Sequence, residues 1–190
     1  MYNNAELVFA FYGYALYITE MGENDMTRTT AREIAVHLAY EMGYSDCSAE
    51  QFLEEKLNRD YFASMAEAEE LYREFPDKEQ LAYIRQVIEG VGRHGYELDS
   101  DIERYAKGWK FSRIPRVAAA IMRVAMYEIL YMPEVPNGAA INEAVEIAKN
   151  YEDDKVVSFI NGILGSFVRA ECAEPEVRNV EAQPETEAQE

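Results

Sequence analysis

Residues 109–131 read WKFSRIPRVAAAIMRVAMYEILY, and residues 133–167 read PEVPNGAAINEAVEIAKNYEDDKVVSFINGILGSF. The first stretch is apolar on almost every side after Pro115, a residue that suits the first turn of a helix because the N–H it lacks is not needed there. The second stretch contains two apolar stripes with helical spacing. We therefore predict a central buried helix ending at Pro133, followed by two helices that pack against it, the first opening at Asn142.

The chain upstream also has the apolar period of helices, and no segment shows sustained strand alternation. Thr30 and Glu33 have capping-box spacing ahead of an apolar face that lasts until Gly43. Ser48 opens a second capping box, and the apolar stripe behind it runs on to Pro76, with a break near Ser64 as the alternative to one continuous helix. Both patterns predict helices.

A further helix is predicted to open at Asp77, an N-cap residue, and to stop at Gly92 or Gly95. A shorter helix closed by Gly108 follows it. Residues 26–170 should therefore form an all-α, compact bundle of about seven helices, because short connections between helices favour that arrangement.

Two acidic segments flank this body in a chain of net charge −18. Residues 1–25 carry four acids and no Lys or Arg, and are expected to be either an extra docked helix or an extension from a misassigned start codon. Residues 171–190 carry seven acids and one Arg, and are expected to be a disordered tail. The apolar run at 5–18 lacks a basic start and is shorter than the ~20 residues that span a bilayer, so a cytoplasmic protein without membrane contact is expected.

The patterns that carry catalysis are missing from this sequence. It has no GxGxxG after a strand, no GxxxxGK[ST], no GxSxG and no HExxH. His37 and His94 fall on different predicted helices, and Cys47 and Cys172 lack zinc-site spacing and are expected to be reduced thiols. We therefore expect no enzyme, no metal site and no cofactor.

Three stretches of the chain carry a common pattern of residues. They are TRTTAREIAVHLAYEMGY from Thr27, the 109–131 stretch and the 133–167 stretch. Together they resemble the NusB family of bacterial transcription antitermination factors. That family shows an ARE start to its first helix, a Trp-to-Arg lead into an AILR-A-YEL helix, and an AINEAxELAK helix followed by FxNGxL. The resemblance covers residues 26–169, is strongest at AINEAVEIAK and FINGIL, and implies a bundle with two helical subdomains.

The resemblance also implies a function and its surfaces. Family members pair with a ribosomal protein, called NusE in transcription, bind the boxA element of nascent RNA with it, and help the transcription elongation complex read through terminators, chiefly in rRNA operons. The family's RNA surface combines the start of the first helix with the loop before AINEA. It implies RNA contact by Arg28, Thr29, Arg32, Glu134, Asn137 and Gly138, and partner contact by Tyr40.

Both implied RNA segments are less basic here than is common in the family. Thr29 and Thr30 stand where further arginines are common, and Asn137 and Gly138 replace what is often an aromatic and a lysine. Each lost phosphate contact lowers RNA affinity, because fewer counterions are released on binding. An acidic chain also repels RNA at long range. We therefore expect weak RNA binding by the protein alone, with the basic partner supplying charge. The alternative is a divergent protein-interaction module with this fold and weak or no RNA binding.

Overall fold

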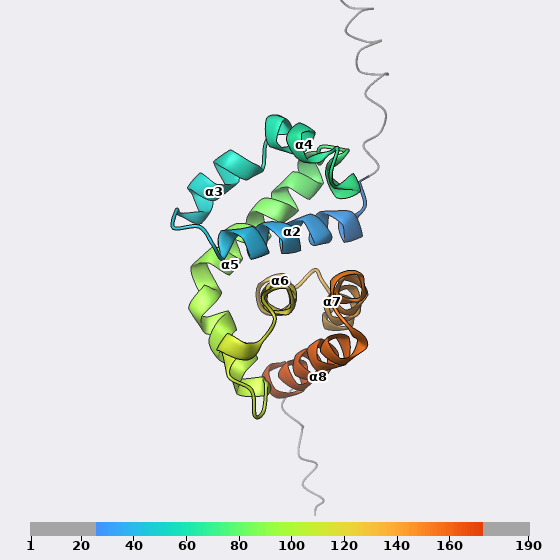
Figure 1. Ribbon diagram of the computed structural model, residues 1–190. Helices are drawn as coiled ribbons and strands as arrows, with labels where there is room; N and C mark the ends of the chain where they lie inside the picture. Colours follow the sequence, from blue (N-terminus) through green and yellow to red (C-terminus); the bar gives the residue numbers. More distant parts are fainter. Residues whose placement is uncertain (1–25, 173–190) are drawn as a thin grey trace, which may run out of the picture.

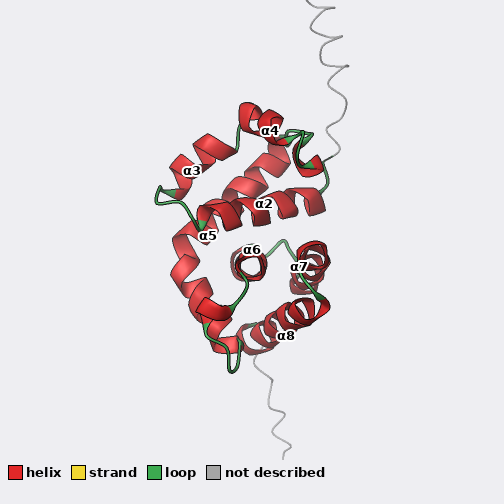
Figure 2. Ribbon diagram, in the orientation of Figure 1, coloured by secondary structure: helices red, strands yellow, loops and turns green. Residues whose placement is uncertain are grey.

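The computed structural model describes residues 26–172, so the expectations for residues 1–25 and for the tail from residue 173 onward lie outside the described residues. Within residues 26–172 the chain forms seven α-helices and two 3-10 turns and no strand (Figure 2), which confirms the all-α prediction. In chain order these are α2 (Arg28–Met42), α3 (Ala49–Lys56), α4 (Arg59–Met65), η1 (Glu70–Tyr72), α5 (Lys78–Tyr105), η2 (Phe111–Arg113), α6 (Arg116–Tyr131), α7 (Asn137–Tyr151) and α8 (Asp154–Glu171).

Helix α6 lies at the centre of the molecule, as its composition predicts. It is seen end-on in Figure 1, with α2, α5, α7 and α8 around it. Every residue from Ala118 to Ile129 except Arg123 is buried. Small alanine side chains let neighbouring helices approach this core closely. None of the helices between residues 26 and 172 combines the length and the apolar character needed to span a bilayer.

Helix α5 links the two halves of the fold. Its first half packs against α2 and α3, and its second half runs alongside α6 and reaches α8 (Figure 1). The segment before α5 is less regular than the single apolar stripe suggested. The capping box at Ser48 is present, but Asn58 starts a new helix by accepting a hydrogen bond from the backbone N–H of Tyr61 at 2.9 Å.

The prediction that Gly92 or Gly95 ends a helix is wrong, because α5 continues without a break to Tyr105. Gly90 shows why glycine occurs inside this helix. A Cβ atom built there would lie 2.0 Å from two ring carbons of Tyr127 on α6. Glycine therefore serves close packing of α5 on α6 at this position, and tertiary contacts outweigh its low helix propensity.

Two helix starts differ from the predicted ones. The N-cap of α2 is Thr27, whose hydroxyl accepts a hydrogen bond from the N–H of Thr30 at 3.1 Å. Helix α7 begins at Asn137 rather than at Asn142, because the carbonyl of Pro136 already accepts the first helical hydrogen bonds. Two residues assigned to the preceding loop by the sequence thus lie in the first turn of α7.

Candidate nucleic-acid interface

Arg32 lies in the second turn of α2 and points into the bundle, where only 5% of it is exposed. Its Nε atom is 3.0 Å from each carboxylate oxygen of Glu128 on α6, and its Nη1 atom is 3.0 Å from Oε2 of Glu143 on α7. The hydroxyl of Tyr83 on α5 donates to Oε1 of Glu128 at 2.8 Å. These four side chains, which we call the buried ion cluster, join four helices.

Oppositely charged side chains face each other in the buried ion cluster. Glu128 is fully buried, and a buried carboxylate is tolerated only when it is paired and hydrogen-bonded. Burial alone would lower the pKa of Arg32, but its hydrogen bond to Glu128 and the surrounding negative charges raise that pKa overall. Burial and then the charge of Glu128 raise the pKa of Tyr83, so its hydroxyl remains a donor at neutral pH. The cluster is therefore a fixed anchor for the start of α2.

Arg28 and Thr29 precede this anchor and reach the surface. Nη2 of Arg28 donates to Oε1 of Glu79 at 2.8 Å, and its guanidinium lies 4.3 Å above the ring of Tyr83. The hydroxyl of Thr29 donates to Oε2 of Glu143 at 2.7 Å. Glu79 is well exposed, so its pairing with Arg28 is weak and can be exchanged for another anion.

The second predicted segment lies where the chain enters α7. Glu134 is exposed in the turn after α6, Asn137 is half-buried, and Gly138 is exposed in the first helical turn. A Cβ atom at Gly138 would meet no atom within 4 Å, and the φ angle of this residue is not positive. The position therefore has space for a long side chain.

Glu143 joins α7, the helix that begins at Asn137, to the start of α2. It lies on α7, and it accepts hydrogen bonds from Thr29 and Arg32 on α2. By contrast, no hydrogen bond or ion pair described for residues 26–172 joins Arg28 to the 134–138 segment. The roles of Glu128 and Glu143 were not predicted from the sequence. An acid within the almost wholly apolar α6 was a signal of buried pairing, but its partner 96 residues away in the chain gives no local sign.

Tyr40, the predicted partner residue, lies at the opposite end of α2 from Arg28, about 18 Å away along the helix axis at 1.5 Å per residue. The hydroxyl of Tyr44 donates to that of Tyr40 at 3.2 Å, and the guanidinium of Arg116 lies 4.5 Å above the ring of Tyr44. These residues and Phe111 line a cavity of about 320 Å³. The predicted RNA residues of α2 therefore lie at its start, and the predicted partner residue lies near its end.

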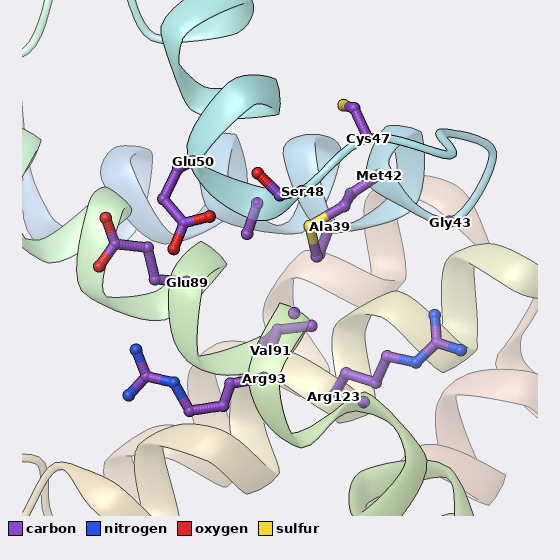
Figure 3. Close-up of a pocket in the computed structure, with 13 residues that line it drawn as sticks. Ala39, Met42, Gly43, Cys47, Ser48, Glu50, Glu89, Val91, Arg93 and Arg123 are labelled. Carbon is purple, nitrogen blue, oxygen red and sulfur yellow. The ribbon is translucent and has the colours of Figure 1, made fainter.

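A larger cavity of about 510 Å³ lies between α2, α3 and α5, and none of the predicted site residues lines it (Figure 3). Acidic Glu50 and Glu89 and basic Arg93 and Arg123 all contribute to its wall. Within the described part of the chain, no group of three or more His, Cys, Asp or Glu side chains is placed to hold a metal ion. Because acidic and basic side chains both line this cavity, its charge does not favour one class of ligand.

Comparison with known proteins identifies the family of this chain. Residues 29–169 match the NusB family. The transcription antitermination protein NusB of Acetivibrio thermocellus is 40% identical over 144 residues, covering 76% of this chain and 90% of that protein. NusB of Clostridium perfringens strain 13 is 40% identical over 139 residues, covering 73% and 94% respectively.

Solved structures agree at the level of the fold. NusB of T. maritima superimposes with a TM-score of 0.61 at 29% identity, over 75% of this chain and 92% of that one. A crystal structure of the antitermination factors NusB and NusE in complex with double-stranded RNA matches with a TM-score of 0.60 at 21% identity, over 75% and 96%. The helix order, the sequence matches and the superpositions agree, and this chain belongs to the NusB family.

Proposed function

We propose that this protein is a transcription antitermination factor that binds boxA-type RNA together with the ribosomal protein NusE and promotes read-through in rRNA operons. It acts in the cytoplasm as part of the transcription elongation complex, by binding rather than by catalysis, and needs no cofactor. Relatives 40% identical to it are named transcription antitermination proteins. A protein of the same fold is solved with NusE and RNA.

The anchored start of α2 is the observation that carries the RNA-binding proposal. The buried ion cluster fixes Arg28 and Thr29 at the surface, and within residues 26–172 the carboxylate paired with Arg28 is that of exposed Glu79. A guanidinium in this state can release its weak partner and bind a phosphate in a bidentate way. Because the side chain also rests on a tyrosine ring, little conformational freedom is lost when RNA binds.

Arg32 has a different place in this proposal. Its donors face Glu128 and Glu143 and it is almost fully buried, so direct contact with a phosphate would require the cluster to open. We assign Arg32 a positioning role, with Arg28, Thr29, Asn137 and Gly138 as the RNA-facing set and exposed Glu134 at its edge.

The partner proposal places NusE at the Tyr40 end of α2. There Tyr44 and Arg116 extend the surface with an exposed ring and a cation. Aromatic and arginine side chains are enriched at protein interfaces because they bury large areas at low entropic cost. A basic partner bound there would also offset the repulsion between this acidic chain and RNA.

The test is a titration of labelled boxA-type RNA with this protein, with its NusE homologue, and with the equimolar mixture. The proposal predicts weak binding to the protein alone and at least about tenfold tighter binding to the mixture, which corresponds to about 1.4 kcal/mol. Equal affinities for the mixture and for NusE alone would overturn it.

A second candidate function is a protein-interaction module that keeps the fold without binding RNA. The burial of Arg32 favours it, because it leaves Arg28 as the one basic side chain of the predicted RNA set that reaches the surface in the described chain. The same titration separates the two candidates. A module of this kind would form the NusE complex, detected by size-exclusion chromatography, without any gain in RNA affinity.

A further inference from the structure

A groove of about 770 Å³ lies between the end of α5, the turn after it, and α8. Trp109 stands at its wall, half exposed, with its ring 5.5 Å from that of Phe159. Figure 1 shows the end of α8 beside the turn that follows α5. The groove combines an exposed aromatic surface with a polar wall.

The charge of this groove is opposite to that of the chain. Three cations line it, Arg104, Lys107 and Arg169, and none of the described carboxylates does. Lys107 and Arg169 make no ion pair with any residue between 26 and 172, and Arg169 donates to the hydroxyl of Ser166 at 3.1 Å. In a protein of net charge −18, such a surface selects an anionic occupant.

We propose that the groove is occupied by the protein's own acidic C-terminal segment, residues 173–190. This segment carries six glutamates and a single arginine, and Val177 and Val180 lie among the acids. Carboxylates for Lys107 and Arg169, together with small apolar side chains for Trp109, match what the groove displays.

The first acid of the C-terminal run already lies at the rim. Glu171, the last residue of α8, accepts a hydrogen bond from Arg104 at 2.9 Å and another from the hydroxyl of Tyr105. The segment therefore starts within the charge field of the groove. With at most about 3.6 Å per residue, its first eight residues span up to about 29 Å, enough to follow the groove.

Tethering makes this contact effective although each exposed ion pair is weak. A segment covalently joined to the protein that carries its site can reach an effective concentration in the millimolar range. The acidic segment thus holds the groove against anions offered from solution, and high salt releases it because the pairs are exposed. This inference goes beyond the proposed function and does not depend on NusE or on boxA.

Trp109 provides a direct probe, because it is the single tryptophan of the chain. We would measure quenching of its fluorescence by neutral acrylamide in the full-length protein. Two variants should free the ring of Trp109: the tail variant Glu174→Gln, Glu176→Gln, Glu181→Gln and the groove variant Lys107→Gln, Arg169→Gln. In each, acrylamide should quench the fluorescence about twofold more strongly than in wild type at low salt, because the tethered segment no longer covers the ring. Wild type in about 1 M salt, where the Debye length is only about 3 Å, should match them.

The matched control is Glu54→Gln, Glu55→Gln, Glu67→Gln, which removes the same charge from exposed positions in the α3 and α4 region. It should quench like wild type. Equal quenching in wild type and in both test variants would overturn the proposal. So would protection of wild-type Trp109 by added single-stranded RNA at low salt, because that result would show a groove open to nucleic acid. Neither outcome bears on NusE-dependent boxA binding.

Discussion

The Nε atom of Arg32 on α2 lies 3.0 Å from each carboxylate oxygen of Glu128 on α6, and both side chains are buried. An acid and a base 96 residues apart in the chain thus fix the start of the first described helix to the centre of the bundle. Arg32 therefore supports the fold, whereas Arg28 is the arginine of α2 that we propose binds RNA.

The two arginines of α2 should respond differently to alanine. Arg32→Ala leaves Glu128 buried without its cation and is expected to cost about 3–5 kcal/mol of unfolding free energy. Arg28→Ala should cost less than about 1 kcal/mol, because its pair with Glu79 is exposed, yet it should weaken RNA binding by the NusE mixture and lower the salt dependence. Urea unfolding and RNA titration give the two readouts. An Arg32→Ala protein as stable as wild type would contradict the anchoring role.

Gly138 offers a gain-of-function test. Space is open around its Cβ position in the first turn of α7, so Gly138→Lys should fold and should place a cation at the proposed RNA face. RNA affinity should rise, and the slope of log K against log salt should steepen by about 0.7 for one added phosphate contact on single-stranded RNA. Gly138→Ala is the control, since it makes a similar change to the helix without charge. Identical RNA binding by the two variants would place this turn away from RNA.

Two buried tyrosines should govern stability in alkali. Burial raises the pKa of Tyr83 and of Tyr72 above the value of about 10 that tyrosine has in an unfolded chain. Their stabilising contribution is therefore complete below a pH of about 10 and is lost as the pH rises above that value, because ionisation is then easier in the unfolded state. Replacing either residue by phenylalanine should flatten this loss, measured by urea unfolding between pH values of about 8 and about 11.

At neutral pH the same two substitutions should have different effects on the free energy of unfolding. The hydroxyl of Tyr83 donates to Glu128, so Tyr83→Phe should cost about 1.5–3 kcal/mol. The buried hydroxyl of Tyr72 has no hydrogen-bond partner among the described residues, so Tyr72→Phe should be neutral or stabilising. Equal destabilisation by the two substitutions would contradict this assignment of the hydrogen bonds.

Glycines of α5 provide a test of the fold. In Gly90→Ala the new methyl group would overlap the ring of Tyr127, so a loss of about 1–3 kcal/mol is expected. Gly95→Ala meets no atom within 4 Å and should stabilise the helix by up to about 1 kcal/mol. Thermal unfolding of both variants would show shifts of opposite sign; a lower melting temperature for Gly95→Ala would mean that α5 is interrupted there.

Local signals predicted much of this fold. The apolar run of α6 predicted its burial, and the caps at Ser48 and Asp77 were correct because each depends on residues only three positions apart. The continuity of α5 could not be predicted in this way. Gly92 or Gly95 was predicted to stop this helix, although α5 continues through both. The close packing of Gly92, where a Cβ atom would lie 2.9 Å from the Cβ of Ala49 on α3, depends on a residue 43 positions earlier in the chain.

The residues of the candidate site also differ in whether they could be predicted from the sequence. Arg28 and Thr29 were predicted from the resemblance alone, and whether they bind RNA remains a prediction. The burial of Arg32 follows from Glu128 and Glu143, whose positions depend on how α6 and α7 pack against α2. Side chains that act through such long-range pairs show no spacing pattern in a single sequence.

Competition between two RNAs for the equimolar mixture of this protein and its NusE homologue is the decisive measurement. Labelled boxA-type RNA would be displaced by unlabelled boxA-type RNA or by an RNA of the same composition in scrambled order, at physiological salt. We predict that the scrambled RNA competes at least about tenfold less well, a difference of about 1.4 kcal/mol, and that the preference is lost without this protein. Equal competition by the two RNAs, or an unchanged preference without this protein, would contradict its role in boxA recognition.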